Sequence, residues 1–152
     1  MLGISLVGAS ENRNQPFMCE LKNEETIYLP EIRQAANRYI QILNQIGDPG
    51  SDYQTDEIIS LCAINCKKVR NEKILFEDRE QFPSQLDAGK LWLGAWSIDV
   101  QELLIAAEDR AAIIRYRLST EREGDLVVIA ILYFDSNYKI CEINEVHNQL
   151  EQ

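Results

Sequence analysis

The last third of the chain reads as a succession of β-strands joined by short polar turns. Apolar and polar residues alternate over residues 96–101 and 114–118, which is typical of strands buried on one face. Residues 126–134 are almost wholly apolar and indicate a central strand covered on both sides, and residues 139–147 close the set. Because segments rich in Gly, Asp, Asn and Ser connect the last three runs, we expect an antiparallel meander.

A helical pattern precedes these strands. Apolar positions recur at steps of three and four residues, which predicts one helix with Pro30 in its first turn and Gly47 at its C-terminal end. The positions that form its apolar face are Leu29, Ile32, Ala36, Tyr39, Leu43 and Ile46.

Two further helices are expected, one short and starting at Thr55, the other starting near Gln81. Residues 67–77, between them, read as two short strands that turn at 70–72. Helices first and strands afterwards predict an α+β fold with the helices on one face of a sheet.

Length, charge and hydropathy limit the number of domains and the kinds of partner. The 152 residues fit one domain, which we place at residues 27–152 behind an extended, polar N-terminal arm at residues 1–26. The 25 acidic residues outnumber the 15 basic ones and give a net charge of −10, which argues against nucleic acid or membrane as a partner. No apolar run approaches the roughly 18 residues of a membrane-spanning helix, so we expect a cytoplasmic protein.

The chain has four cysteines and a single histidine, His147. Three residues separate Cys62 from Cys66, the other two cysteines lie far away, and there is no CxxC pair. A tetrahedral zinc set cannot be built at ordinary spacings, and phosphate-binding glycine motifs are absent from the sequence. We therefore expect reduced thiols, no metal and no cofactor; a disulfide between Cys62 and Cys66 is the alternative.

Two stretches resemble a known superfamily, the nuclear transport factor 2-like proteins, which include ketosteroid isomerase and the SnoaL-like cyclases. Residues 36–48 read ANRYIQILNQIGD, and this run is similar to the first-helix pattern of an aromatic residue and Leu-Asn ahead of Gly-Asp. Residues 133–146 read YFDSNYKICEINEV, similar to the family's strand, turn, Lys-Ile-x-Glu and closing His-Trp-Asp. The resemblance implies three N-terminal helices on a curved antiparallel sheet, with an apolar, cone-shaped cavity between them.

The resemblance also implies which side chains would line a ligand pocket. On the sheet, period-two alternation places several apolar and aromatic side chains on the face that looks toward the first helix. A packed core is the competing interpretation of the same pattern. The predicted pocket residues are Tyr39, Trp96, Ile98, Tyr116, Ala130, Leu132, Ile143 and Glu145.

Tyr39 and Glu145 are the weak catalytic candidates. Tyr39 matches the tyrosine that donates a hydrogen bond to the developing enolate in ketosteroid isomerase, but a tyrosine at such a position is more often a core residue with a satisfied hydroxyl. That enzyme also needs two carboxyl groups, and the matching positions here hold Arg70 or a neighbour and Ala130. Steroid isomerase chemistry is therefore not expected.

In the cyclase-like members a histidine and an acid cooperate, but Ile143 stands at the histidine position and Glu145 replaces the aspartate. If the strand is regular, Glu145 shares a face with Cys141, Ile143 and His147. A carboxylate at a cavity wall would have a raised pKa and could act as a general base; a solvated or arginine-paired glutamate is the alternative. His147, near the end of the strand, is expected to be solvated.

Basic residues suggest two further roles. Arg115 and Arg117 should lie on the outer sheet face, opposite Asp99 and Gln101, where the resemblance implies a homodimer. They are interpreted as forming salt bridges across the sheet or between subunits, and a solvated face is the alternative. The cluster of Lys67, Lys68, Arg70 and Lys73 is interpreted as an edge-strand guard against aggregation rather than an anion site.

Two functional hypotheses follow, and they leave open whether the protein is an enzyme. The first is a non-catalytic domain that binds a small apolar ligand or a protein partner, because the carboxyls and the histidine of the enzymes are missing. The alternative is an isomerase, cyclase or hydratase on an apolar carbonyl substrate, with Glu145 as general base and Tyr39 as oxyanion donor. A pure interaction module comparable to nuclear transport factor 2 itself is a third, with no motif specific to it.

Overall fold

The computed structural model describes residues 29–150, so the arm predicted at residues 1–26 lies outside the described residues. The helical elements are α1 (Leu29–Gly47), α2 (Phe82–Leu93) and the 3-10 segments η1 (Thr55–Leu61), η2 (Arg79–Gln81) and η3 (Ala107–Asp109). The strands are β2 (Cys62–Arg70), β3 (Lys73–Phe76), β4 (Trp96–Ala106), β5 (Ala111–Thr120), β6 (Gly124–Phe134) and β7 (Ile140–Gln149). The expected α+β class is confirmed.

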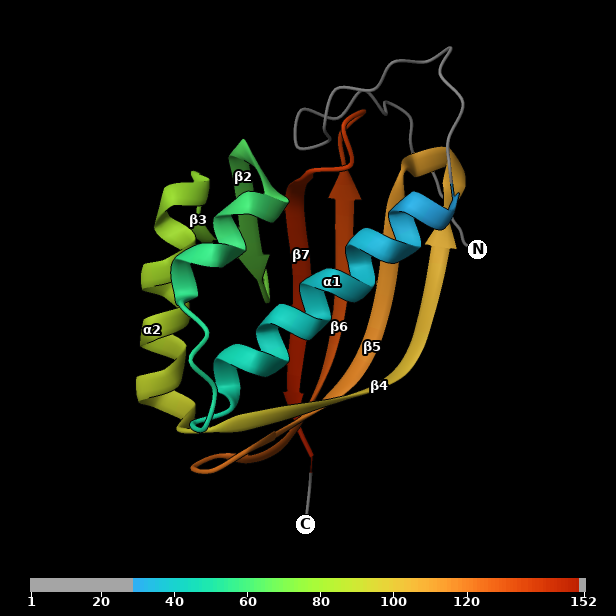
Figure 1. Cartoon of the computed structure of the whole chain (residues 1–152). Coiled ribbons are helices and arrows are strands. Elements are labelled where there is room, and N and C mark those ends of the chain that lie inside the picture. Colours follow the sequence, from blue (N-terminus) through green and yellow to red (C-terminus); the bar gives the residue numbers. More distant parts are fainter. Residues whose placement is uncertain (1–28, 151–152) are drawn as a thin grey trace.

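Helix α1 has the predicted extent and the predicted buried face. Its inward residues, from Ile32 to Ile46, pack on the inner face of the sheet, where α1 crosses the strands diagonally (Figure 1). Gly47 closes the helix against the indole of Trp96, and a methyl group at this position would collide with that ring. The Trp96 Nε1 donates to the carbonyl oxygen of Leu43 at 2.9 Å, so the helix end and the start of β4 are tied together.

The second expected helix forms as the 3-10 segment η1, and the third as α2. The carboxylate of Asp78 accepts from the amide of Glu80 at 2.8 Å, and Pro83 lies in the first turn of α2, as its missing N–H requires. Gly94 ends α2 with a φ of 72°, a conformation that favours glycine.

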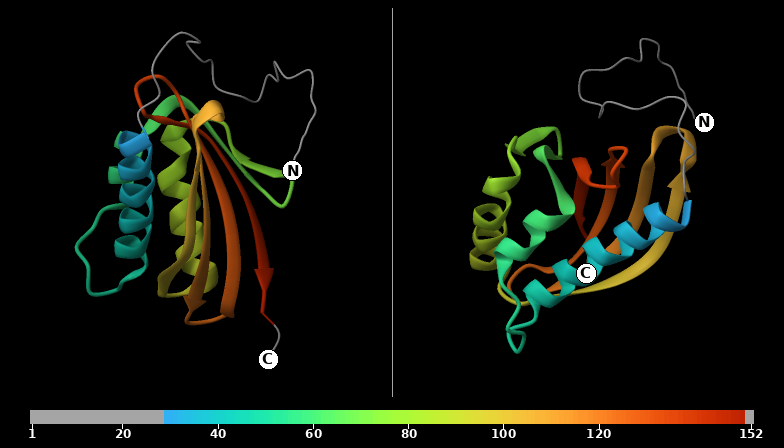
Figure 2. Two further views of the ribbon diagram at one scale, coloured as in Figure 1. Left: turned by 90° about the vertical axis from the view of Figure 1, so that its right-hand side faces the viewer. Right: turned by 45° about the horizontal axis from the view of Figure 1, so that its top comes forward.

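The six strands form one sheet in the order β3-β2-β7-β6-β5-β4. Strands β4 to β7 make the predicted antiparallel meander, but β2 pairs with β7 in parallel, so the sheet is mixed rather than purely antiparallel. The view turned by 90° shows both α-helices on one face of the curved sheet (Figure 2, left). Local turns specify the meander, whereas the β2–β7 pair joins residues at least 75 positions apart and leaves no local signal.

The turn between β2 and β3 falls where the sequence predicts it. Asn71 and Glu72 have φ values of 48° and 71°, the two positive values of a two-residue hairpin turn. Asn71 also attaches this hairpin to β7: its amide donates to the carbonyl oxygen of Glu145 at 3.0 Å, and its side chain accepts from the amide of His147 at 3.1 Å.

A register shift near the start of β7 changes which side chains point inward. Tyr133 pairs with Glu142 and Phe134 with Ile140, so Cys141 falls in a bulge and Ile140 takes the buried place. The expectation that Cys141 shares a face with Ile143 and Glu145 is therefore wrong. Cys141 is disulfide-bonded, which corrects the expectation of reduced thiols at this position, whereas Cys62 and Cys66 are buried free thiols.

The outer face of the sheet carries the expected arginines. Arg117 lies opposite Asp99 but pairs with Asp125 at 3.5 Å, and Arg115 pairs with Glu102 at 3.4 Å because an irregularity shifts the register after Val100. The homodimer through this face stays a prediction. None of the described helices is long and apolar enough to cross a membrane.

Candidate functional site

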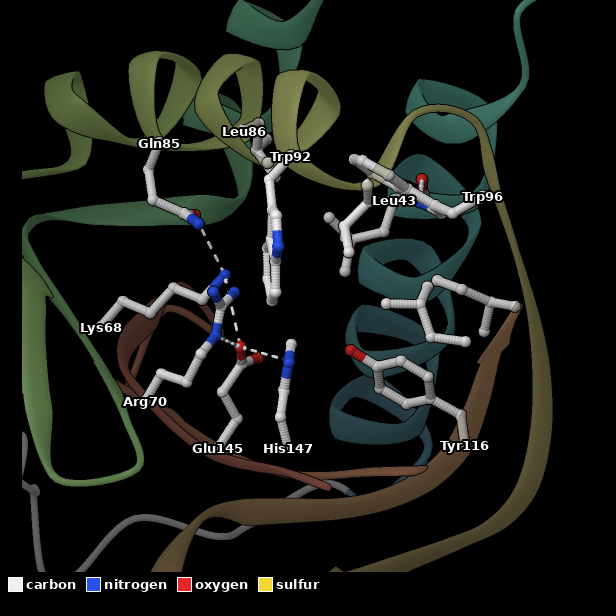
Figure 3. A pocket seen from close by; sticks show the side chains of 14 residues that line it. Leu43, Lys68, Arg70, Gln85, Leu86, Trp92, Trp96, Tyr116, Glu145 and His147 are labelled. Carbon is white, nitrogen blue, oxygen red and sulfur yellow. Dashed lines mark hydrogen bonds and ion pairs between the residues drawn. The ribbon is translucent and has the colours of Figure 1, made fainter. Parts of the chain in front are cut away.

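A half-open cavity of about 50 Å³ lies between α2 and the inner face of the sheet. Its size is several times the roughly 10–15 Å³ that one water needs, so it suits a small molecule rather than a steroid. One wall is polar and carries Lys68, Arg70, Gln85, Glu145 and His147 (Figure 3). The other wall is apolar and aromatic, with Leu43, Leu86, Trp92, Leu93, Trp96, Ile98, Tyr116 and Leu118.

The polar wall follows from strand geometry and from the parallel pairing of β2 with β7. Lys68 and Arg70 are two residues apart on β2, and Glu145 and His147 are two apart on β7, so each pair shares the inner face. The register sets Arg70 beside Glu145. Neither hairpin nor meander brings these residues together; only the non-local strand pair does.

Glu145 is the centre of this wall and is 2% exposed. Its Oε1 accepts from Arg70 Nε at 2.7 Å, lies 3.1 Å from His147 Nε2 and lies 3.9 Å from Lys68 Nζ. Burial acts to raise the pKa of Glu145, but Lys68, the hydrogen bond to His147 and Arg70 outweigh it and hold the pKa well below its ordinary value. The hypothesis of a raised pKa is therefore wrong, and the alternative, a glutamate paired with an arginine, is confirmed. This carboxylate is a poor general base.

His147 is largely buried in the wall, with a side chain only 10% exposed, so the expectation that it is solvated is wrong. When neutral, an imidazole that donates from Nε2 to a carboxylate keeps its lone pair on Nδ1. The Nδ1 atom is buried and has no hydrogen-bond partner among the described residues. Glu145 thus orients the imidazole ring of His147.

Lys68 is 3% exposed, and its Nζ donates to Gln85 Oε1 at 3.1 Å and lies 5.0 Å from the centre of the Phe82 ring. Burial lowers the pKa of Lys68 from 10.5 to about 8; Glu145 acts to raise it and Arg70 adds to the lowering. The interpretation of this cluster as an edge guard is wrong for Lys68 and Arg70, because β3 is the edge strand and both side chains face inward.

The predicted pocket residues divide into two groups. Trp96, Ile98, Tyr116 and Glu145 surround the cavity, whereas the other four are fully buried and do not line it: Tyr39, Ala130, Leu132 and Ile143. The phenol that points into the cavity is that of Tyr116 (Figure 3).

Tyr39 lies in the hydrophobic core. Burial, and secondly the charge of Glu145, raise the pKa of Tyr39 well above its ordinary value. Its hydroxyl has no hydrogen-bond partner among the described residues. The site therefore offers Tyr116, rather than Tyr39, as the phenol nearest to a ligand.

Sequence reasoning missed Lys68, Arg70, Trp92 and His147 as cavity residues. The alternation of Lys68 and Arg70 along one strand was the available signal, but its meaning depends on the partner strand. No cluster of His, Cys, Asp and Glu able to hold a metal occurs within residues 29–150.

No protein-family model and no curated protein matches this chain in sequence. Solved structures do match it. A protein of unknown function with a cystatin-like fold from Methylobium petroleophilum PM1 superposes with a TM-score of 0.67 at 16% identity, covering 84% of this chain and 82% of that one. An NTF2-like protein of unknown function from Exiguobacterium sp. 255-15 gives 0.64 at 12% identity, covering 76% and 99%.

The chain has the nuclear transport factor 2-like fold. The epoxide hydrolase/cyclase-like enzyme SalBIII, described for pyran ring formation in the polyether salinomycin, shares this fold with a TM-score of 0.63 at 11% identity, covering 78% of this chain and 92% of that one. The nuclear transport factor 2-like fold thus carries enzymes as well as proteins of unknown function. At these identities the likeness concerns the fold and leaves the reaction open.

Proposed function

We propose that this protein binds a small organic molecule that carries a carboxylate and a short apolar part in the cavity of Figure 3. The observation that carries the proposal is the imbalance of charge on the polar wall, where two cations, Lys68 and Arg70, share one carboxylate, Glu145. This imbalance stands out in a chain of net charge −10. It revises the expected apolar ligand to a partly apolar anion.

Hydrogen-bond geometry supports the same ligand. Arg70 uses its Nε for Glu145, and no described residue accepts from its terminal amino groups, which form the part of a guanidinium that grips a carboxylate. The Arg70 side chain is 22% exposed, so a ligand can reach it. Trp92, Leu43 and Trp96 offer apolar surface on the opposite wall for the rest of the molecule.

A thermal-shift comparison of short carboxylates with their neutral amides tests the proposal. At about ten times its dissociation constant a ligand adds about 1.4 kcal/mol, which for this chain length raises the melting temperature by about 3–6 °C. We expect this shift with butyrate, isovalerate or benzoate, none with the matched amides, and none in Arg70→Gln. Arg115→Gln removes an arginine from the outer face and should keep the shift. Equal shifts with acids and amides, or with wild type and Arg70→Gln, would overturn the proposal.

A second candidate is an isomerase, cyclase or hydratase, favoured by the Glu145–His147 pair at the cavity wall. We propose that His147 is then the base and that Glu145 holds its tautomer, with Tyr116 rather than Tyr39 close to the substrate. 2-Oxobutyrate, which has acidic protons beside its ketone group, should exchange these carbon-bound protons for deuterium in D₂O, at least tenfold more slowly with His147→Gln. An exchange rate unchanged in that variant contradicts the role of His147.

A further inference from the structure

Lys68 is unusual among lysines because its side chain is buried. Its amine lies at the wall of the cavity. Gln85 holds the amine with a single acceptor at 3.1 Å, and Glu145 lies farther off, at 3.9 Å. The hydrogen bond to Gln85 survives if the amine loses its proton, since a neutral amine still donates to the amide oxygen, whereas the ionic attraction of Glu145 is lost. The nitrogen therefore keeps its place at the cavity wall whether it is charged or neutral.

The surroundings of Lys68 favour the neutral, nucleophilic form. Its neighbours include the Phe82 ring and the Arg70 cation, and its pKa falls from 10.5 to about 8. At pH 8 about half of such an amine is neutral, whereas an ordinary lysine is neutral in roughly one molecule in three hundred. Burial and a neighbouring cation are the features that activate imine-forming lysines.

We propose that the amine of Lys68 forms an imine with the carbonyl group of a small oxo acid whose carboxylate is held by Arg70. This inference rests on the proposed carboxylate ligand and names its reactive group. Arg70 Nε and Lys68 Nζ both approach the same oxygen of Glu145, at 2.7 and 3.9 Å, so the two cations are neighbours. A 2-oxo acid carries its carboxylate beside a carbonyl group, so one small molecule in the cavity presents both groups to this pair of side chains.

The step is a redox-neutral condensation. The lone pair of the neutral amine forms a bond to the carbonyl carbon, and the carbonyl electron pair moves to oxygen, which takes up a proton. The nitrogen gives up its two protons in the course of the reaction, the hydroxyl leaves as water, and a C=N bond remains. Solvent that enters at the open side of the cavity supplies and accepts these protons.

Reductive trapping of the full chain tests the inference. The protein is incubated with pyruvate or 2-oxobutyrate and cyanoborohydride, and the modified lysine is located by peptide mass spectrometry. We expect Lys68 to be modified at least tenfold faster than any other lysine. We also expect 2-oxobutyrate to react at least tenfold faster than butanone, which lacks the carboxylate.

Neighbouring lysines provide the controls. Lys67→Arg changes the adjacent residue, whose side chain lies on the other side of β2, and should leave the trapping rate unchanged. Lys68→Arg and Lys68→Met should lose the rapid phase, and a thermal transition checks that each variant is folded. Modification spread evenly over the lysines overturns the imine, and equal rates with butanone overturn the oxo acid.

The two proposals fail separately. If simple carboxylates raise the melting temperature but Lys68 is not trapped, the imine is wrong and the carboxylate site stands. If carboxylates give no shift and the oxo acids give no adduct, both proposals are wrong.

Discussion

Glu145→Ala is expected to lower the free energy of unfolding by about 3–5 kcal/mol at neutral pH, because it leaves buried cations without a counter-charge. Lys68 is 3% exposed and Arg70 only 22%, and both would lose the carboxylate that balances their charge. His147 would lose the acceptor of its Nε2 proton as well. Urea denaturation measures the change.

Glu102→Ala is the matched control. Glu102 also pairs with an arginine, Arg115, but at 3.4 Å on the outer face with both side chains about half exposed. Such pairs contribute about 0–1 kcal/mol. If the two variants lose similar stability, the carboxylate of Glu145 is not the buried counter-charge described here.

The same ion pairs predict how the stability of the protein changes at acidic pH. Since the pKa of Glu145 is lower in the folded protein than its ordinary value of 4.5, the unfolded chain binds the proton more readily. The contribution of Glu145 to stability is therefore present above about pH 4.5 and is lost as the pH falls below it. The stability of Glu145→Gln should decline less steeply over this range than that of the wild type.

Gly47→Ala is the second substitution with a large expected effect, about 2–4 kcal/mol of destabilisation. The new methyl group would collide with the Trp96 indole, whose Nε1 bonds the carbonyl oxygen of Leu43 at 2.9 Å. Either the ring moves and loses this bond or the helix end shifts, and overpacking of this kind costs about 1–3 kcal/mol beyond the bond itself. Denaturation and the near-ultraviolet signal of Trp96 report the change.

Gly89→Ala supplies the contrast within another helix. Gly89 lies in the interior of α2, and a methyl group there meets nothing within 4 Å. Alanine should therefore stabilise the helix by about 0.5–1 kcal/mol. Destabilisation by both substitutions would mean that glycine is needed for reasons other than contact with Trp96.

Local features of the sequence were sufficient to predict most of the helices and strands. The three- and four-residue spacing from Leu29 to Ile46 predicts α1 to its last residue, because one buried face determines a helix. The turns of the meander predict the order of β4 to β7, since short connections join antiparallel neighbours. The turn at Asn71 and Glu72 was likewise predicted from the sequence.

The site was decided by contacts that no local pattern encodes. The sequence predicts Glu145 as a candidate site residue and Tyr116 as a pocket residue. It indicates surface positions for Lys68 and Arg70, and a solvated position near the end of the strand for His147. The parallel pairing of β2 with β7 turns all three inward onto Glu145, and their charges reverse the expected shift in its pKa.

Residue spacing and turn chemistry act over a few residues, so helix α1, the meander and the α+β class could be predicted from the chain alone. The burial of Tyr39, the small size of the cavity and its cationic wall could not. Burial and electrostatics depend on which strands pair, and β2 and β7 pair across at least 75 residues of chain.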